Sequence, residues 1–164
     1  MDVSAVPGTA VRNHPDHDDR LLRACRIADD VLAPVAQITD RSSIPSSHFD
    51  ALREAGLFSL GDLSVGSARR IMATIAGGCG ATFFVWVQHH GVVRTIAASP
   101  DTDLRADLLP GLLDGSIIAG TAFAHVRRVG STAVRATRTA GGWRLDGRAP
   151  WATSWGIADR FTVA

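Results

Sequence analysis

Residues 141–154 read GGWRLDGRAPWATS, and this stretch decides the fold of the chain. Its paired glycines favour a tight turn, because glycine adopts a positive φ without steric cost. Trp143 and Leu145 then share one face of the next segment, which is typical of a half-buried strand. Asp146 and Gly147 indicate a second turn. The stretch therefore predicts a β-hairpin that is followed by the segment Trp-Ala-Thr-Ser.

Three neighbouring segments also have the pattern of strands. Residues 117–123 are rich in β-branched and small side chains, and residues 132–138 and 160–164 alternate between apolar and polar ones. The last segment reaches the end of the sequence without a stop signal. Three or four short strands with open edges make a poor independent unit. We therefore expect a truncated sequence, in which residues 117–164 are part of a β-domain.

Upstream of these strands the sequence is helical. Apolar residues recur at helical spacing in three segments, residues 18–38, 46–56 and 103–115. Pro34 should kink or end the first of these helices, and Asp103 is the expected cap of the last. We therefore expect a helical domain over residues 18–116, preceded by a disordered leader over residues 1–17.

The most hydrophobic stretch, residues 67–99, allows two interpretations. Residues 71–87 carry no formal charge and approach the ~20 residues that a membrane helix needs. The middle of this run contains three glycines, Gly77, Gly78 and Gly80. They favour a pair of helices in a bundle, where small residues either break the run or let two backbones approach closely. His89 and His90 follow, and we expect them to pack rather than bind metal, because adjacent helical residues point about 100° apart.

Composition argues against several classes of function. With 17 basic and 16 acidic residues the net charge is +1, whereas nucleic-acid binding needs a concentrated positive surface. Cys25 and Cys79 stand far apart without neighbouring ligands, which argues against a zinc site and a disulfide framework. Residues 1–19 lack the apolar core of a signal peptide. We expect a cytoplasmic protein that binds no metal, no nucleic acid and no membrane.

Taken in order, these segments resemble the acyl-CoA dehydrogenase superfamily. Residues 44–57, IPSSHFDALREAGL, are similar to a family segment in which Pro precedes a helix ending in Glu-Ala-Gly-Leu. Residues 107–115, DLLPGLLDG, resemble its leucine- and proline-containing helix, and residues 130–131 match the end of its Thr-Glu-Pro-x-x-Gly-Ser motif. Residues 141–154 resemble its hairpin followed by Trp-Ile-Thr-Asn, and residues 158–164 its next strand. The resemblance implies an α+β fold: an N-terminal α-helical bundle domain followed by the first strands of an antiparallel β-barrel-like middle domain.

The resemblance also implies a flavin site and the cofactor FAD. In the family the Trp-x-Thr strand lies beside the isoalloxazine ring, and the Gly-Ser pair contacts the flavin pyrophosphate or the thioester arm of the substrate. The cofactor-binding residues implied for this chain are Trp151, Ala152, Thr153, His125, Gly130 and Ser131. His125 replaces a threonine that faces the flavin, so it is either a partner of flavin or substrate or a surface histidine. Trp151 is either a flat wall for the flavin or a core tryptophan, and Ser131 is either a contact or an ordinary turn serine.

The activity implied by the resemblance is α,β-dehydrogenation of an acyl thioester, with FAD as hydride acceptor and a carboxylate as base. In the family that carboxylate lies in a C-terminal helical domain that this sequence lacks. Glu54, the single Glu, is expected on a surface helix, so no catalytic residue is assigned. We expect a fragment or a degenerate paralogue that is inactive alone. The implied partners are acyl-CoA or another small-molecule substrate and, at full length, further copies of the chain in a homo-oligomer (tetramer or dimer).

Two other functions remain open. One is a flavin-dependent monooxygenase on the same fold, because His125, Val126 and Arg127 stand where the family has Thr-Glu-Pro. The other is a non-catalytic helical or membrane-associated protein, because residues 71–87 are uncharged and apolar.

Overall fold

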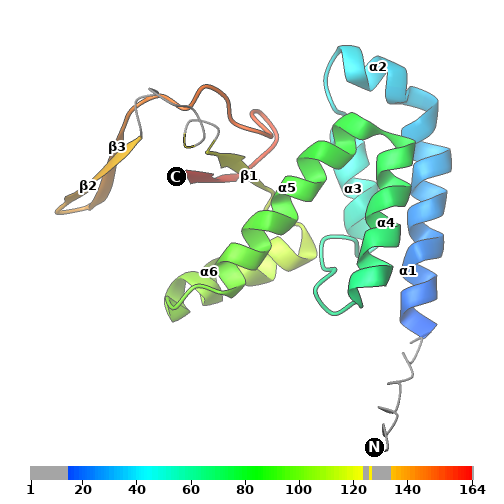
Figure 1. Cartoon of the computed structure of the whole chain (residues 1–164), viewed down its shortest axis with the longest axis horizontal. Helices are drawn as coiled ribbons and strands as arrows, with labels where there is room; N and C mark the ends of the chain where they lie inside the picture. The colour runs from blue at the N-terminus through cyan, green and yellow to red at the C-terminus, as the bar shows by residue number, and fades with distance from the viewer. Residues whose placement is uncertain (1–14, 124–125, 127–133, 164) are drawn as a thin grey trace, which may run out of the picture.

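Helices come first and strands second, as the sequence predicts (Figure 1). The computed structural model describes residues 15–123, 126 and 134–163. The helices are α1 (Pro15–Arg26), α2 (Ala36–Arg41), α3 (Ser46–Glu54), α4 (Val65–Gly78), α5 (Gly80–Ala97) and α6 (Thr102–Asp114). The strands are β1 (Ala119–Ala122), β2 (Arg135–Thr139), β3 (Gly142–Asp146) and β4 (Arg160–Val163). The α+β arrangement is confirmed, while the exact domain boundaries and the leader stay predictions.

The first predicted helix is interrupted near Pro34. After α1 the backbone widens into a π-helix over Ile27–Leu32 and tightens into a 3-10 turn over Ala33–Val35, before α2 begins. Proline has no N–H to donate, and its ring crowds the preceding turn of a regular helix. The predicted kink is therefore confirmed.

Helix α6 begins one residue earlier than the sequence suggests, and its cap differs. The Asp101 carboxylate accepts hydrogen bonds from the backbone N–H groups of Asp103 and Leu104 at 3.1 and 2.9 Å. The prediction of Asp103 as cap was wrong, because only the aspartate that precedes the first turn reaches its free N–H groups. Asp103 lies within the first turn, where its charge suits the helix dipole.

The hydrophobic run splits into α4 and α5 at Cys79, whose backbone is extended with φ −156° and ψ 112°. Gly78 meets the π-helix at Ala28, since a Cβ added to Gly78 would lie 2.8 Å from the Ala28 Cα. The glycines thus both break the run and let two backbones approach. The part of the chain that the structure describes contains no helix that is both long and apolar enough to cross a membrane.

The main core lies within the helical bundle, where α1 and α4 pack side by side and α5 leads toward the strands (Figure 1). The largest fully buried side chains include Trp86, Phe49, Phe58, Leu52, Leu57, Ile71 and Ile75. The Trp86 indole N–H donates to the Leu57 carbonyl at 3.2 Å, so the polar edge of this buried ring has a partner.

His89 joins the helices to the first strand. Its buried imidazole donates from Nε2 to the Leu112 carbonyl at 2.9 Å and accepts at Nδ1 from the Ala119 N–H at 3.1 Å. Only a neutral imidazole makes both bonds, because the protonated ring has no acceptor. Burial lowers the pKa of His89, which favours this neutral form. The predicted packing role is confirmed, and one side chain ties α5, the end of α6 and β1 together.

The strands form two separate sheets of two strands each among the described residues. β2 and β3 are the predicted antiparallel hairpin, with Arg138 opposite Trp143. β1 and β4 instead run parallel, with Gly120 opposite Phe161. Parallel partners need a long crossover, and the chain between β1 and β4 provides it. In Figure 1 the hairpin extends away from the helices, whereas β1 lies beside α5.

Substitution of the two adjacent glycines, Gly77 and Gly78, should have different effects on stability. Gly78→Ala should lower the free energy of unfolding by about 1–3 kcal/mol, because the new methyl group clashes with the Ala28 backbone. Gly77 has nothing within 4 Å of an added Cβ, so Gly77→Ala should be neutral or stabilise by up to about 1 kcal/mol. Urea denaturation of both variants measures the difference. Equal effects would contradict the close approach of α4 and the π-helix.

Acidification should destabilise the fold through its buried histidines. Burial lowers the pKa of His89, and burial together with the neighbouring His89 lowers the pKa of His90 to about 3. Below the ordinary histidine pKa of 6.5 the unfolded chain therefore binds more protons than the folded one. Stability should be full above about pH 6.5 and fall as the pH drops toward these lowered values.

Urea denaturation at about pH 7.5 and pH 5 tests this, since the free energy of unfolding should be smaller at the lower pH. His90→Leu removes one titrating ring and should show a smaller drop between the two pH values. A drop of the same size in the variant would show that His90 titrates alike in the folded and unfolded chains.

Candidate functional site

The predicted flavin-contacting segment, residues 151–154, lies against strand β1. The Thr153 N–H donates to the Thr121 carbonyl at 2.9 Å, and the Thr121 N–H donates to the Thr153 hydroxyl oxygen at 3.1 Å. The two hydroxyl oxygens lie 2.8 Å apart, and both threonines are buried. These reciprocal bonds fix the segment alongside β1, although residues 151–154 do not themselves form a strand.

Gly120 makes this close packing possible. A Cβ added there would lie 2.5 Å from the Thr153 carbonyl oxygen and 2.8 Å from the Phe161 ring. Any larger residue would therefore push the Thr153 backbone or the Phe161 ring away. The absence of a side chain at Gly120 brings the segment and the β4 aromatic ring against the same point of β1.

Gln88 connects this arrangement to helix α5. The Thr121 hydroxyl donates to Gln88 Oε1 at 3.1 Å. Gln88 is adjacent to His89, so consecutive residues of α5 contact the middle and the start of β1. The position of the candidate segment thus depends on a helix of the bundle.

Ser154 turns the chain away from β1 with an unfavourable backbone. Its φ of +69° is the one positive value of a non-glycine residue within the described ranges. The Ser154 carbonyl accepts from the N–H groups of Ile157 and Ala158, both at 2.9 Å, while its buried hydroxyl has no hydrogen-bond partner. A left-handed backbone costs about 1–2 kcal/mol outside glycine, and a buried unpaired hydroxyl about 1–3 kcal/mol. Such combinations concentrate at ligand sites.

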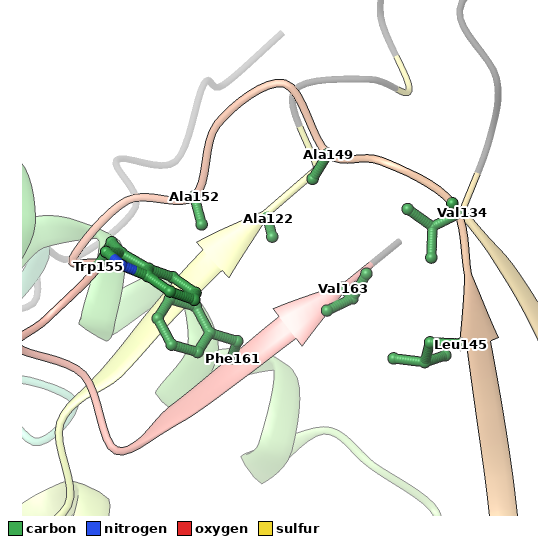
Figure 2. Close-up of a pocket in the computed structure, with 9 residues that line it drawn as sticks. Ala122, Val134, Leu145, Ala149, Ala152, Trp155, Phe161 and Val163 are labelled. Carbon is green, nitrogen blue, oxygen red and sulfur yellow. The ribbon is translucent and has the colours of Figure 1, made fainter.

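An apolar cavity of about 400 Å³ opens beside this segment (Figure 2). Trp155 and Phe161 form one wall, with ring centroids 5.9 Å apart, and Figure 2 shows Val134 and Leu145 facing them from the hairpin side. The nine lining residues are Ala122, Val134, Leu145, Gly147, Ala149, Ala152, Trp155, Phe161 and Val163. None of these side chains is charged. A concave apolar space of this size is typical of a small-molecule site.

The structure separates the predicted site residues into three groups. Ala152 lines the cavity, and Trp151 precedes it with 60% of its surface exposed, so the alternative of a core tryptophan is wrong. Thr153 is turned toward β1 and its hydroxyl is engaged there. The remaining predicted residues, His125, Gly130 and Ser131, lie outside the described residues, and their roles stay predictions.

Sequence patterns missed several residues of this site. Phe161 was recognised as part of an alternating strand, but its contact with Trp155 was not. Gln88 and Thr121 gave no signal, because hydrogen-bonded partners 33 and 32 residues apart leave no local pattern. The only feature of the sequence that could have drawn attention to Gln88 is its polar side chain on an otherwise largely apolar helix.

Solved structures of flavoproteins share this arrangement of helices and strands. Over 92% of its length the chain matches glutaryl-CoA dehydrogenase from Mycobacterium smegmatis in complex with FADH2, with a TM-score of 0.75 and 19% identity. Over 98% of its length it matches butyryl-CoA dehydrogenase from Megasphaera elsdenii, with a TM-score of 0.77 and 17% identity. The fold is that of the acyl-CoA dehydrogenases. The FAD complex of PigA has it as well, with a TM-score of 0.70 and 22% identity over 98% of the chain.

The chain spans less than half of each of these three structures: 42% of the Mycobacterium smegmatis enzyme and 44% of each of the other two. These structural matches confirm, at the level of the fold, the resemblance inferred from the sequence motifs. No protein-family model matches the chain, and no curated protein sequence does.

Replacement of Gly120 should disturb the site and the fold together. Gly120→Ala should lower the free energy of unfolding by about 1–3 kcal/mol, because the methyl group overlaps the Thr153 carbonyl. Gly141→Ala is the matched control, since an added Cβ there meets nothing within 4 Å. Urea denaturation and amide exchange at Thr153 measure both effects. A Gly120→Ala variant as stable as the control would disprove the tight contact between β1 and the segment.

Proposed function

We propose that this chain binds FAD at the apolar cavity that residues 151–155 help to form. The chain would be the N-terminal portion of an acyl-CoA dehydrogenase-type oxidoreductase. The observation that carries the proposal is the pairing of Thr153 with Thr121, which holds the Trp-Ala-Thr segment beside the cavity. The glutaryl-CoA dehydrogenase structure of the same fold contains FADH2, and the PigA structure contains FAD. These flavin complexes support the assignment of the cofactor.

The residues present fit a flavin. A tricyclic ring needs a flat apolar surface, and the Trp151 indole, which precedes the cavity-lining Ala152 in the chain, is 60% exposed. Ala152 adds a small wall, and the buried Ser154 hydroxyl is an unpaired polar group next to it. Thr153 has its hydroxyl committed to β1, so we assign it to holding the segment rather than to direct contact. Trp151 and Ala152 are then the proposed contacts to the flavin.

The proposed reaction is α,β-dehydrogenation of an acyl thioester such as an acyl-CoA. Bound FAD supplies a hydride acceptor. The chain's own residues contribute an apolar wall that excludes water and a fixed backbone that orients the ring. A base is also required, and none of the cavity residues carries a carboxylate. Glu54 is exposed on α3, so we propose that proton abstraction requires a residue outside the described part of the chain.

A flavin-dependent monooxygenase on the same fold is the second candidate. Its support is the sequence, because His125, Val126 and Arg127 stand where the acyl-CoA dehydrogenase family has Thr-Glu-Pro. A bound flavin that acyl-CoA reduces under anaerobic conditions would favour the dehydrogenase. Reduction by an external reductase, followed by oxygen consumption with product, would favour the monooxygenase. A homo-oligomeric assembly and a cytoplasmic location belong to both candidates and stay predictions.

Loss of the Trp151 indole should weaken flavin binding. Trp151→Ala should raise the dissociation constant for FAD about five- to tenfold, because stacking on an aromatic side chain contributes roughly 1–1.5 kcal/mol. Trp143→Ala is the matched control, because Trp143 is similarly exposed at 64% but belongs to strand β3 of the hairpin rather than to the segment that Thr153 fixes against β1. Quenching of flavin fluorescence on titration measures both constants. Equal affinities for the two variants would show that the flavin lies elsewhere.

A further inference from the structure

We propose that Gln88 is a positioning residue, which acts through Thr121 to hold residues 151–154 in place for the flavin. Its role in the flavin site rests on the proposed function above. Its role in holding the segment rests on contacts within the chain alone.

The direction of the hydrogen bonds assigns the role to Gln88. The Thr121 hydroxyl donates its single hydrogen to Gln88 Oε1 at 3.1 Å. The hydrogen between the two threonine hydroxyls, 2.8 Å apart, must therefore come from Thr153. The Thr153 hydroxyl lies farther, at 3.2 Å, from its other acceptor, the Thr121 carbonyl. The hydrogen bonds therefore form a series in which Thr153 donates to Thr121 and Thr121 donates to Gln88. Because Gln88 is the last acceptor, it determines the direction in which both threonine hydroxyls donate.

The same chain determines what Thr153 can offer a ligand. Its hydroxyl hydrogen is directed inward to Thr121, and its oxygen already accepts from the Thr121 N–H at 3.1 Å. Without an acceptor at Gln88, the Thr121 hydroxyl would be free to turn its hydrogen toward the Thr153 oxygen, and the Thr153 hydroxyl would then turn its own hydrogen to the Thr121 carbonyl. Gln88 therefore keeps Thr153 in a single orientation.

Hydrogen bonds add to the close packing at Gly120 in fixing the segment against β1. The four residues of β1, Ala119–Ala122, have small side chains, and Gly120 has none. Small residues pack without strong preference for one register, whereas directional bonds between buried groups do select one. Gln88 is half-buried, and Thr121 and Thr153 are 8% and 9% exposed, so water competes little with the two inner partners.

Three variants test the proposal. Gln88→Leu removes the acceptor, and Gln88→Glu keeps one, since a carboxylate oxygen also accepts. Gln37→Leu is the control, because Gln37 is the other glutamine of the chain and is exposed on α2. Amide hydrogen exchange without ligand is measured over residues 119–122 and 151–154, with residues 71–75 of the α4 core as an internal reference. The FAD dissociation constant and the visible flavin spectrum are measured in parallel.

Gln88→Leu should speed exchange at residues 151–154 about three- to tenfold, the effect of one lost hydrogen bond, without changing the α4 core. It should weaken FAD binding by a similar factor and shift the flavin spectrum. Gln88→Glu and Gln37→Leu should resemble the unmodified chain.

Unchanged exchange at residues 151–154 in Gln88→Leu would overturn the positioning role, whatever happens to FAD. Faster exchange throughout the α4 core would also overturn it, because Gln88 would then support overall stability only. Faster exchange confined to the segment with unaltered FAD affinity would uphold the positioning role and instead overturn the flavin assignment. If the unmodified chain binds no FAD, the flavin assignment is likewise overturned. The exchange measurement still decides whether Gln88 positions the segment.

Discussion

The structure depends on the contact between helix α5 and strand β1. Gln88 and His89, consecutive residues of the helix, bond to Thr121 and Ala119 of the strand. Adjacent side chains on a helix point about 100° apart, so both bonds form only with the helix in one rotation about its axis. α5 also packs on α4 and α6. The orientation of the strand is therefore inherited from the packing of the helical bundle.

Polar side chains can join α5 to β1 because their hydrogen-bond partners lie within the chain. His89 uses one nitrogen for Leu112 at the end of α6 and the other for Ala119, so the ring has no unpaired nitrogen. His90 differs, since its buried Nε2 has no partner and its ring rests edge-on against Trp86 at 4.6 Å. Burial, followed by the repulsion from His89, lowers the pKa of His90 to about 3. The two neighbouring histidines thus have different roles, one in joining elements and one in packing.

The sequence predicted elements more completely than contacts. Turn glycines and alternation located the hairpin, and the glycine cluster located the break at Cys79, because those signals lie within a few residues of each other. The parallel pairing of β1 with β4 was not predicted, since it depends on a crossover whose path leaves no mark on either strand. The cavity was missed for the same reason: its walls come from β1, the hairpin, the loop before β4 and β4 itself. Trp151 was identified by resemblance to a motif, whereas Trp155, which lines the cavity, was not.

The energetics of residues 151–154 favour a site that is formed before its ligand arrives. Ser154 holds a left-handed backbone and a buried unpaired hydroxyl, and both oppose folding. The reciprocal Thr121–Thr153 bonds and the two bonds to the Ser154 carbonyl act in the opposite direction and keep the turn in place. A ligand group that pairs with the Ser154 hydroxyl would remove the second of these unfavourable contributions. That gain would add to its affinity without further ordering of the chain, because the surrounding backbone is already fixed.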